Sequence, residues 1–221
     1  MTPPPAPVVA PAPPADWPAL GQLLARAYGA DRPLPPDYLD QLLHLERFLD
    51  IGELWGGWIG QTLAGGYLLI DNGLTGYVKD PPGPEVGFRI LGVDPPWRGQ
   101  GVARALLDQA VVWGRQRGAE AVALYTAPAM RPAHRLYESY GFVRQPERDS
   151  WVNSDQHPLW AYRYLIPPQP TSVPGQATPP PVTTPPPVET TPLRTEAATV
   201  PTGSTPVQTA ATSTPAESTA L

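Results

Sequence analysis

Proline is distributed unevenly along the 221 residues, and this limits which part of the chain can fold. Residues 1–14 are almost entirely Pro, Ala and Val, and residues 167–221 are dominated by Pro, Thr, Ser, Ala and Val. Such stretches bury too little apolar surface to offset the cost of ordering their backbone, about 1–2 kcal/mol per residue. All seven Trp, nine Tyr and three Phe lie between them. We therefore predict one domain over residues 15–166, flanked by a disordered leader and a disordered tail.

The tail carries two proline runs, residues 179–181 and 185–187, among many Thr and Ser. Runs of this kind adopt the extended polyproline II conformation that proline-recognition modules bind. The tail is interpreted either as a ligand for such modules or as an inert spacer, with an O-modified stalk as a further alternative.

Charge and cysteine content exclude several classes of function. The formal net charge is −5 at pH 7, and no basic stripe could neutralise nucleic-acid phosphates. Without cysteine there is no thiolate chemistry, and His44, His134 and His157 are too scattered for a metal site. No apolar run approaches the ~20 residues of a membrane span, and no secretory signal pattern opens the chain. We expect a soluble, cytoplasmic protein without a metal, nucleic-acid or membrane partner.

Apolar spacing predicts two N-terminal helices, a strand meander and then alternating strands and helices. Leu20, Leu23 and Leu24, for example, recur at helical spacing after a candidate N-cap at Asp16. A long loop is expected over residues 71–84. The predicted helices cover residues 16–29, 36–49, 101–116 and 132–140, and the predicted strands cover 53–59, 63–70, 86–93, 121–126, 142–143 and 159–166.

The most informative local feature is a predicted strand that runs through a glycine-containing loop directly into a helix, over residues 93–104. Its sequence is Val-Asp-Pro-Pro-Trp-Arg-Gly-Gln-Gly-Val-Ala-Arg. The loop amides and the free N–H groups of the first helical turn would converge on one spot, where the helix dipole also favours anions. This arrangement suits a pyrophosphate, although neither the Walker nor the Rossmann glycine pattern is present. The alternative is an ordinary strand-to-helix turn.

Two motifs resemble those of the GNAT (GCN5-related N-acetyltransferase) superfamily. The family's phosphate-binding pattern, Gln/Arg-x-x-Gly-x-Gly/Ala, is matched by Arg98, Gly101 and Ala103. A second family element, Ala-x-x-Leu-Tyr-x-x-x-Gly-Phe, is matched at its alanine by Ala133 and at its tyrosine by Tyr137. The resemblance covers nearly all of residues 16–166. It implies an α/β (α+β) fold with a mixed, mostly antiparallel central sheet, helices on both faces and a splay between two parallel strands.

The resemblance also implies acetyl-CoA as co-substrate, and it assigns candidate binding residues. Where many family members carry an asparagine that contacts CoA, this chain has Met130, so that contact is left out. The strand residues expected to offer backbone groups to the pantetheine arm are Leu91, Gly92 and Val93, and those expected to hold the pyrophosphate, mainly through main-chain amides, are Arg98, Gly99, Gln100, Gly101, Val102 and Ala103.

Tyr137 matches the family tyrosine near the thioester sulfur, so the resemblance implies that it protonates the departing CoA thiolate as a general acid. A plain core tyrosine is the alternative. Glu85, just before the cofactor strand, resembles the glutamate that some family members use as a general base; otherwise it is a solvated charge at a strand end. His134 and Asp149 are weaker candidates, and an amine that arrives neutral needs no base.

These features predict an N-acetyltransferase that moves the acetyl group of acetyl-CoA to a primary amine of a small molecule or a protein. The acidic balance favours a cationic acceptor only weakly. A non-catalytic acyl-CoA-binding or sensor domain with an interaction tail is the rival interpretation. A homodimer is compatible with the sequence, which does not identify the acceptor.

Overall fold

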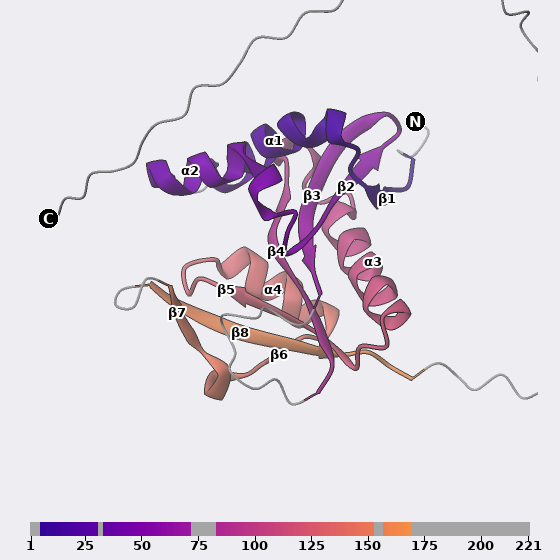
Figure 1. Cartoon of the computed structure of the whole chain (residues 1–221), viewed down its shortest axis with the longest axis vertical. Coiled ribbons are helices and arrows are strands. Elements are labelled where there is room, and N and C mark those ends of the chain that lie inside the picture. The colour runs from indigo at the N-terminus through magenta and orange to yellow at the C-terminus, as the bar shows by residue number, and fades with distance from the viewer. Residues whose placement is uncertain (1–4, 31–32, 72–82, 153–156, 169–221) are drawn as a thin grey trace, which may run out of the picture. The chain divides into compact units, whose positions relative to one another are not determined.

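The computed structural model describes residues 5–30, 33–71, 83–152 and 157–168, and Figure 1 shows their arrangement. The strands form a sheet in the order β1-β2-β3-β4-β5-β8-β6, with β7 pairing β8. All neighbouring strands are antiparallel except β4 and β5, which are parallel. The elements are β1 (Val8–Pro11), α1 (Trp17–Gly29), α2 (Pro36–Leu43), β2 (Gly52–Ile59), β3 (Thr62–Ile70), β4 (Glu85–Val93), α3 (Val102–Gln116), β5 (Ala121–Thr126), α4 (Arg131–Tyr140), β6 (Val143–Arg144), β7 (Ser150–Val152) and β8 (His157–Leu165), with 3-10 turns at Pro14–Asp16, Leu45–Phe48, Pro95–Trp97 and Pro146–Arg148.

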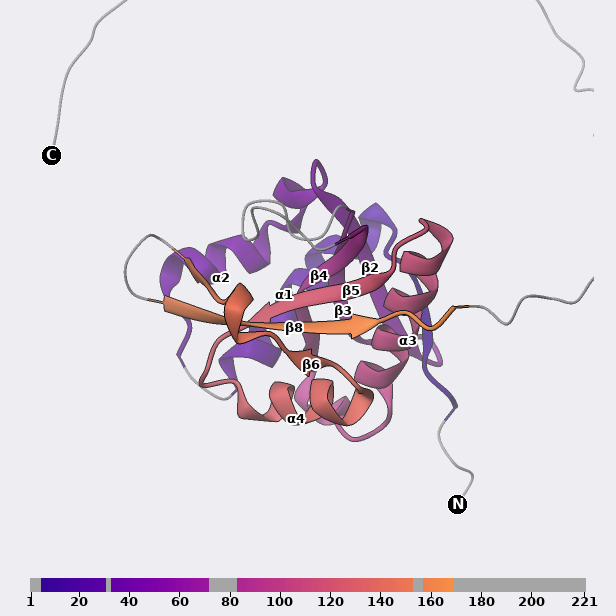
Figure 2. The same ribbon diagram turned by 90° about the horizontal axis from the view of Figure 1, so that it is seen from below.

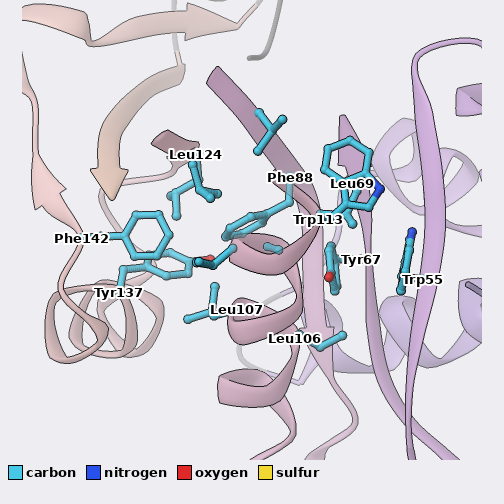
Figure 3. Close-up of a cluster of buried hydrophobic side chains, with 14 of the residues drawn as sticks. Trp55, Tyr67, Leu69, Phe88, Leu106, Leu107, Trp113, Leu124, Tyr137 and Phe142 are labelled. Atoms are coloured by element: carbon cyan, nitrogen blue, oxygen red, sulfur yellow. The ribbon is translucent and has the colours of Figure 1, made fainter. Parts of the chain in front are cut away.

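The sheet separates two apolar cores, which pack under helices on its opposite faces (Figures 1 and 2). One core lies under α1 and α2, where Leu20, Leu24 and Leu42 are fully buried. The other lies under α3 and α4 and is rich in aromatic side chains, as Figure 3 shows. Burial of this apolar surface is the main stabilising contribution to the domain. The predicted mixed sheet with helices on both faces is therefore confirmed.

The leader departs from the sequence prediction, which placed residues 1–14 in a disordered segment. Val8–Pro11 instead forms β1, an edge strand that pairs antiparallel with β2 from Val8↔Trp58 to Pro11↔Trp55. Val9 packs against the core under α3. The proline at its end is tolerated because an edge strand leaves some of its N–H positions unpaired. The predicted tail falls almost wholly outside the described residues, as does most of the predicted loop at 71–84.

The two parallel strands separate partway along their length. β4 and β5 pair only from Glu85↔Ala121 to Gly87↔Ala123. Beyond this point β4 stays with β3 up to Gly65↔Val93, while β5 stays with β8 up to Thr126↔Trp160. A bulge accompanies the divergence: Ile90 has φ of 59°, and the β3–β4 register shifts opposite it. The predicted splay is thus present, and the second half of β4 turns an edge toward the gap.

Candidate active site

The loop between β4 and α3 presents its backbone donors to open space. Gly99 has φ of 77° and Gly101, the N-cap of α3, has φ of 84°, a conformation that glycine adopts without steric cost. The N–H groups of residues 99–104 donate to no acceptor within the part of the chain that the structure describes. A row of free amides at the start of a 15-residue helix is a ready anion site.

All of residues 99–104 except Gln100 border a cavity of about 740 Å³ between the first turns of α3 and α4 and the end of α1. Every candidate binding residue named from the sequence lines it except Gln100, whose side-chain amide donates to the Pro96 carbonyl at 3.1 Å. Met130 and Ala133 contribute the opposite wall from α4 and the residue before it. The structure therefore brings the β4 segment 91–93 and the glycine loop to one place.

Two arginines hold this loop against α1. Arg26 makes a bidentate ion pair with Asp94, with Nε and Nη2 at 3.2 and 2.7 Å from the two carboxylate oxygens. The hydrogen bond to Asp94 raises the pKa of Arg26. Arg98 donates to the carbonyls of Val93, at 3.3 Å, and Ala27, at 2.8 Å. The loop is thus preorganised by contacts with the end of α1.

Tyr137 is a buried residue of α4 that belongs to the aromatic core drawn in Figure 3. Its neighbours Ala133 and Leu136 line the cavity, whereas Tyr137 is not among the described residues that do. Its ring contacts those of Phe88 and Phe142, with centroids 6.0 and 5.8 Å away. The residue is 6% exposed, and no hydrogen bond of its hydroxyl is present among the described residues. Burial raises the pKa of Tyr137, and the neighbouring Tyr38 raises it further. The phenol is therefore kept protonated.

Two further tyrosines near this position were not among the sequence candidates. Tyr28, at the end of α1, lines the cavity, and its ring meets the ring of Tyr38 edge-on at 5.7 Å. Tyr38 in turn acts electrostatically on Tyr137 from α2. Helical spacing places Tyr38 on an apolar face, but nothing in the sequence predicts that Tyr38 comes close enough to Tyr137 to affect its pKa.

Glu85 lies away from the cavity, in a buried ion-pair cluster. Arg148 donates to both of its carboxylate oxygens, at 3.1 and 2.7 Å, and Arg163 donates to one of them. The Glu85 side chain has no exposed surface, and the side chains of the two arginines are only 10% and 16% exposed. Glu85 is therefore not the solvated strand-end charge considered above, and in this arrangement its oxygens are occupied by guanidinium donors.

The weaker base candidates are also engaged by protein groups. His134 Nε2 lies 3.1 Å from the Ala127 carbonyl, and its ring stacks on Trp160 at 5.0 Å. Burial lowers the pKa of His134. Asp149 forms an ion pair with Arg144 at 2.6 Å. Among the described residues, the cavity lining includes none of the three base candidates, which are Glu85, His134 and Asp149.

Two other kinds of feature, a metal-binding cluster and a membrane-spanning helix, are absent from the described part of the chain. Residues 5–30, 33–71, 83–152 and 157–168 contain no group of three His, Cys, Asp or Glu side chains placed to hold a metal ion. No helix in these ranges has the length and apolar character needed to cross a bilayer.

Known structures share the fold at low sequence identity. A GNAT-family acetyltransferase from Staphylococcus aureus is 16% identical with a TM-score of 0.55, and the match covers 73% of this chain and all of that one. The yncA protein of Salmonella typhimurium, solved with its cofactor acetyl-CoA, is 18% identical with a TM-score of 0.51, over 73% of this chain and 95% of that one.

Sequence relatives match over shorter stretches. A mycothiol acetyltransferase from Propionibacterium freudenreichii is 45% identical over 66 residues, which are 29% of this chain and 21% of the relative. This chain thus covers about a fifth of that protein. The sequence profile of the acetyltransferase (GNAT) family matches residues 17–142, from the start of α1 through α4. Because this match covers more than half of the chain and includes both motifs, the chain belongs to the acetyltransferase (GNAT) family.

Proposed function

We propose that this protein transfers the acetyl group of acetyl-CoA to an amine acceptor. The observation that carries the proposal is the row of amides at residues 99–104, which have no acceptor among the described residues and most of which border the cavity beside β4. Family membership supports it, as does the acetyl-CoA in the related yncA structure. Bound acetyl-CoA would supply an activated thioester.

Each part of the cavity suits one part of this co-substrate. The amides of residues 99–104 would bind the pyrophosphate, because free backbone donors at a helix N-terminus favour anions. The unpaired edge of β4 at residues 91–93 would hydrogen-bond the pantetheine arm as an added strand does. The cavity walls are largely apolar side chains, which suits the remaining methylene groups.

Tyr137 would act as the general acid. Its hydroxyl has no protein partner in the described chain, and burial raises its pKa, so it carries a proton to give to the leaving thiolate. We assign no general base. Glu85 is occupied by its ion pairs with two arginines. The simpler mechanism is therefore one in which the acceptor amine arrives neutral or loses its proton to water.

The acceptor is proposed only as a primary amine of a small molecule or a protein. The short match to a mycothiol acetyltransferase supports a small molecule, while the net charge of −5 favours a cationic one weakly.

A matched pair of glycine substitutions tests the cradle. Gly101→Ala and Gly118→Ala each place a side chain at positive φ, 84° and 70°, at opposite ends of α3, so both variants should lose similar stability. Only Gly101→Ala should weaken binding of CoA in calorimetry, by about 10-fold or more. Equal affinities in the two variants would contradict the proposal.

A screen of amines that follows release of the CoA thiol tests turnover. Thiol release that depends on one class of amine supports the transferase. Tight binding of acetyl-CoA with no release for any amine would instead support the non-catalytic sensor.

A further inference from the structure

The charges that line the cavity are few. Among the described residues, Arg98 and Arg104 are the only lining side chains that carry a charge. CoA carries a pyrophosphate and, on its ribose, a separate 3′-phosphate. The free amides of residues 99–104 are close together and can serve the pyrophosphate, so the second phosphate needs a donor of its own.

Arg98 is largely committed to the protein. Its guanidinium donates to the Val93 and Ala27 carbonyls, which tie the loop to the end of α1. Both contacts lie on the side of the cavity formed by β4 and α1, the side that suits the pantetheine arm. Arg98 is therefore better placed to position the loop than to reach the nucleotide end of a ligand.

Arg104 stands in the first turn of α3, on an exposed side of the cavity. Its guanidinium carbon lies 5.3 Å from the centre of the Tyr140 ring on α4, a cation–π contact that limits its orientation. No carboxylate in the described ranges pairs with it, since neither an ion pair nor a hydrogen bond of its side chain is present there. Asp108, one turn further along α3, accepts a hydrogen bond from the Tyr140 hydroxyl at 2.8 Å instead.

We propose that Arg104 binds the ribose 3′-phosphate of CoA, with the Tyr140 ring holding its guanidinium between α3 and α4. This inference rests on the proposed function and assigns one residue of its binding site. A guanidinium without a carboxylate partner keeps its donors for a phosphate, which it can bind bidentately. The contact distinguishes CoA from ligands that lack this phosphate.

Calorimetry with two probes, CoA and 3′-dephospho-CoA, tests the assignment on the full chain. The wild-type protein should bind CoA at least ~10-fold more tightly than dephospho-CoA, as expected for a charge-assisted contact. Arg104→Ala should lose that preference by weakening only CoA, and Arg104→Lys should keep part of it. Arg135→Ala, an exposed arginine of α4 outside the cavity, removes the same net charge and should keep the full preference.

The remaining outcomes separate this inference from the proposed function. Equal weakening of both probes in Arg104→Ala, with an unchanged thermal midpoint, would assign Arg104 to the pyrophosphate and overturn the inference alone. An unchanged preference in Arg104→Ala would also overturn it. If the wild-type protein bound neither probe, the proposed function would fail and the inference with it.

Discussion

At the scale of single residues, Tyr137 combines a ring packed in the aromatic core with a hydroxyl whose pKa is raised by burial. Replacing Tyr137 by Phe keeps the ring contacts with Phe88 and Phe142 and removes only the proton donor. We expect kcat to fall ~10-fold or more while the affinity for CoA stays nearly the same. Steady-state thiol release and calorimetry measure the two quantities. Tyr164→Phe, a change to another tyrosine packed on Phe142, serves as the control.

The same residue predicts a pH effect of known sign. Burial raises the pKa of Tyr137 above its ordinary value of about 10, so the acid stays protonated across the neutral and mildly alkaline range. Loss of activity below about pH 9 should therefore belong to another group. The measurement is the pH profile of kcat for the wild-type protein and for Tyr137→Phe. If the wild-type kcat declined with rising pH below about pH 9 and this decline disappeared in Tyr137→Phe, the pKa of Tyr137 would be lower than the structure indicates.

The contacts of Glu85 predict a role in stability, whereas the family resemblance implied a role as general base. Glu85→Gln would leave Arg148 and Arg163 facing each other with little exposure. Removing one partner of a buried ion pair typically costs about 3–5 kcal/mol of unfolding free energy. Urea unfolding should show a loss of this size, whereas exposed Glu147→Gln should show almost none. A variant that kept its stability but lost kcat would restore Glu85 as the base.

At the scale of elements, the helices and strands with a strong apolar period were predictable. The sequence places α3, α4, β4 and β5 within one or two residues of their observed ends. It extends the second helix to Leu49, whereas α2 ends at Leu43 because His44 adopts φ of −126° and ψ of 58°. A 3-10 turn follows, in which Leu45 is buried. Tertiary packing decides this break, and no local residue such as Gly or Pro marks it.

β1 was missed for a related reason. Its four residues are too few to show a period, and their Pro- and Ala-rich setting resembles a disordered leader. Pairing with β2 supplies the stabilisation that the segment lacks alone. Deleting residues 1–11 should lower stability by roughly 2 kcal/mol, from lost strand pairing and burial of Val9. Thermal unfolding should then show a midpoint ~4–8 °C lower, whereas deleting residues 1–4 should change it little. An equal midpoint would mean that β1 contributes nothing.

In the site, too, the parts that are contiguous in sequence were predictable, whereas the contacts between distant residues were not. The glycine loop and the β4 segment are continuous in sequence, so motifs could find them. Arg26 and Asp94 are 68 positions apart, and Arg98 and Ala27 are 71 apart, so their contacts depend on how α1 docks on the sheet. Arg104 and Tyr140 likewise meet only because α3 and α4 flank one cavity.

At the scale of the whole molecule, the splay divides the sheet into two arms that the cavity bridges. Leu91 and Gly92 line it from the β4 arm, and Met130 and Ala133 line it from the segment that follows β5. A ligand that fills the cavity would therefore contact both arms. It should stabilise the entire domain, by about 2.7 kcal/mol when its concentration is 100 times its Kd.

Hydrogen exchange distinguishes this global effect from direct contact. Without ligand, the amides of residues 99–104 have no described acceptor and should exchange quickly. Saturating CoA should slow them at least ~10-fold, because the pyrophosphate becomes their acceptor. The exposed turn at residues 60–61, far from the cavity in sequence and absent from its lining, should exchange as before. If CoA stabilised the core strands but left residues 99–104 unprotected, the ligand would be bound elsewhere, because global stabilisation does not slow amides that exchange without unfolding.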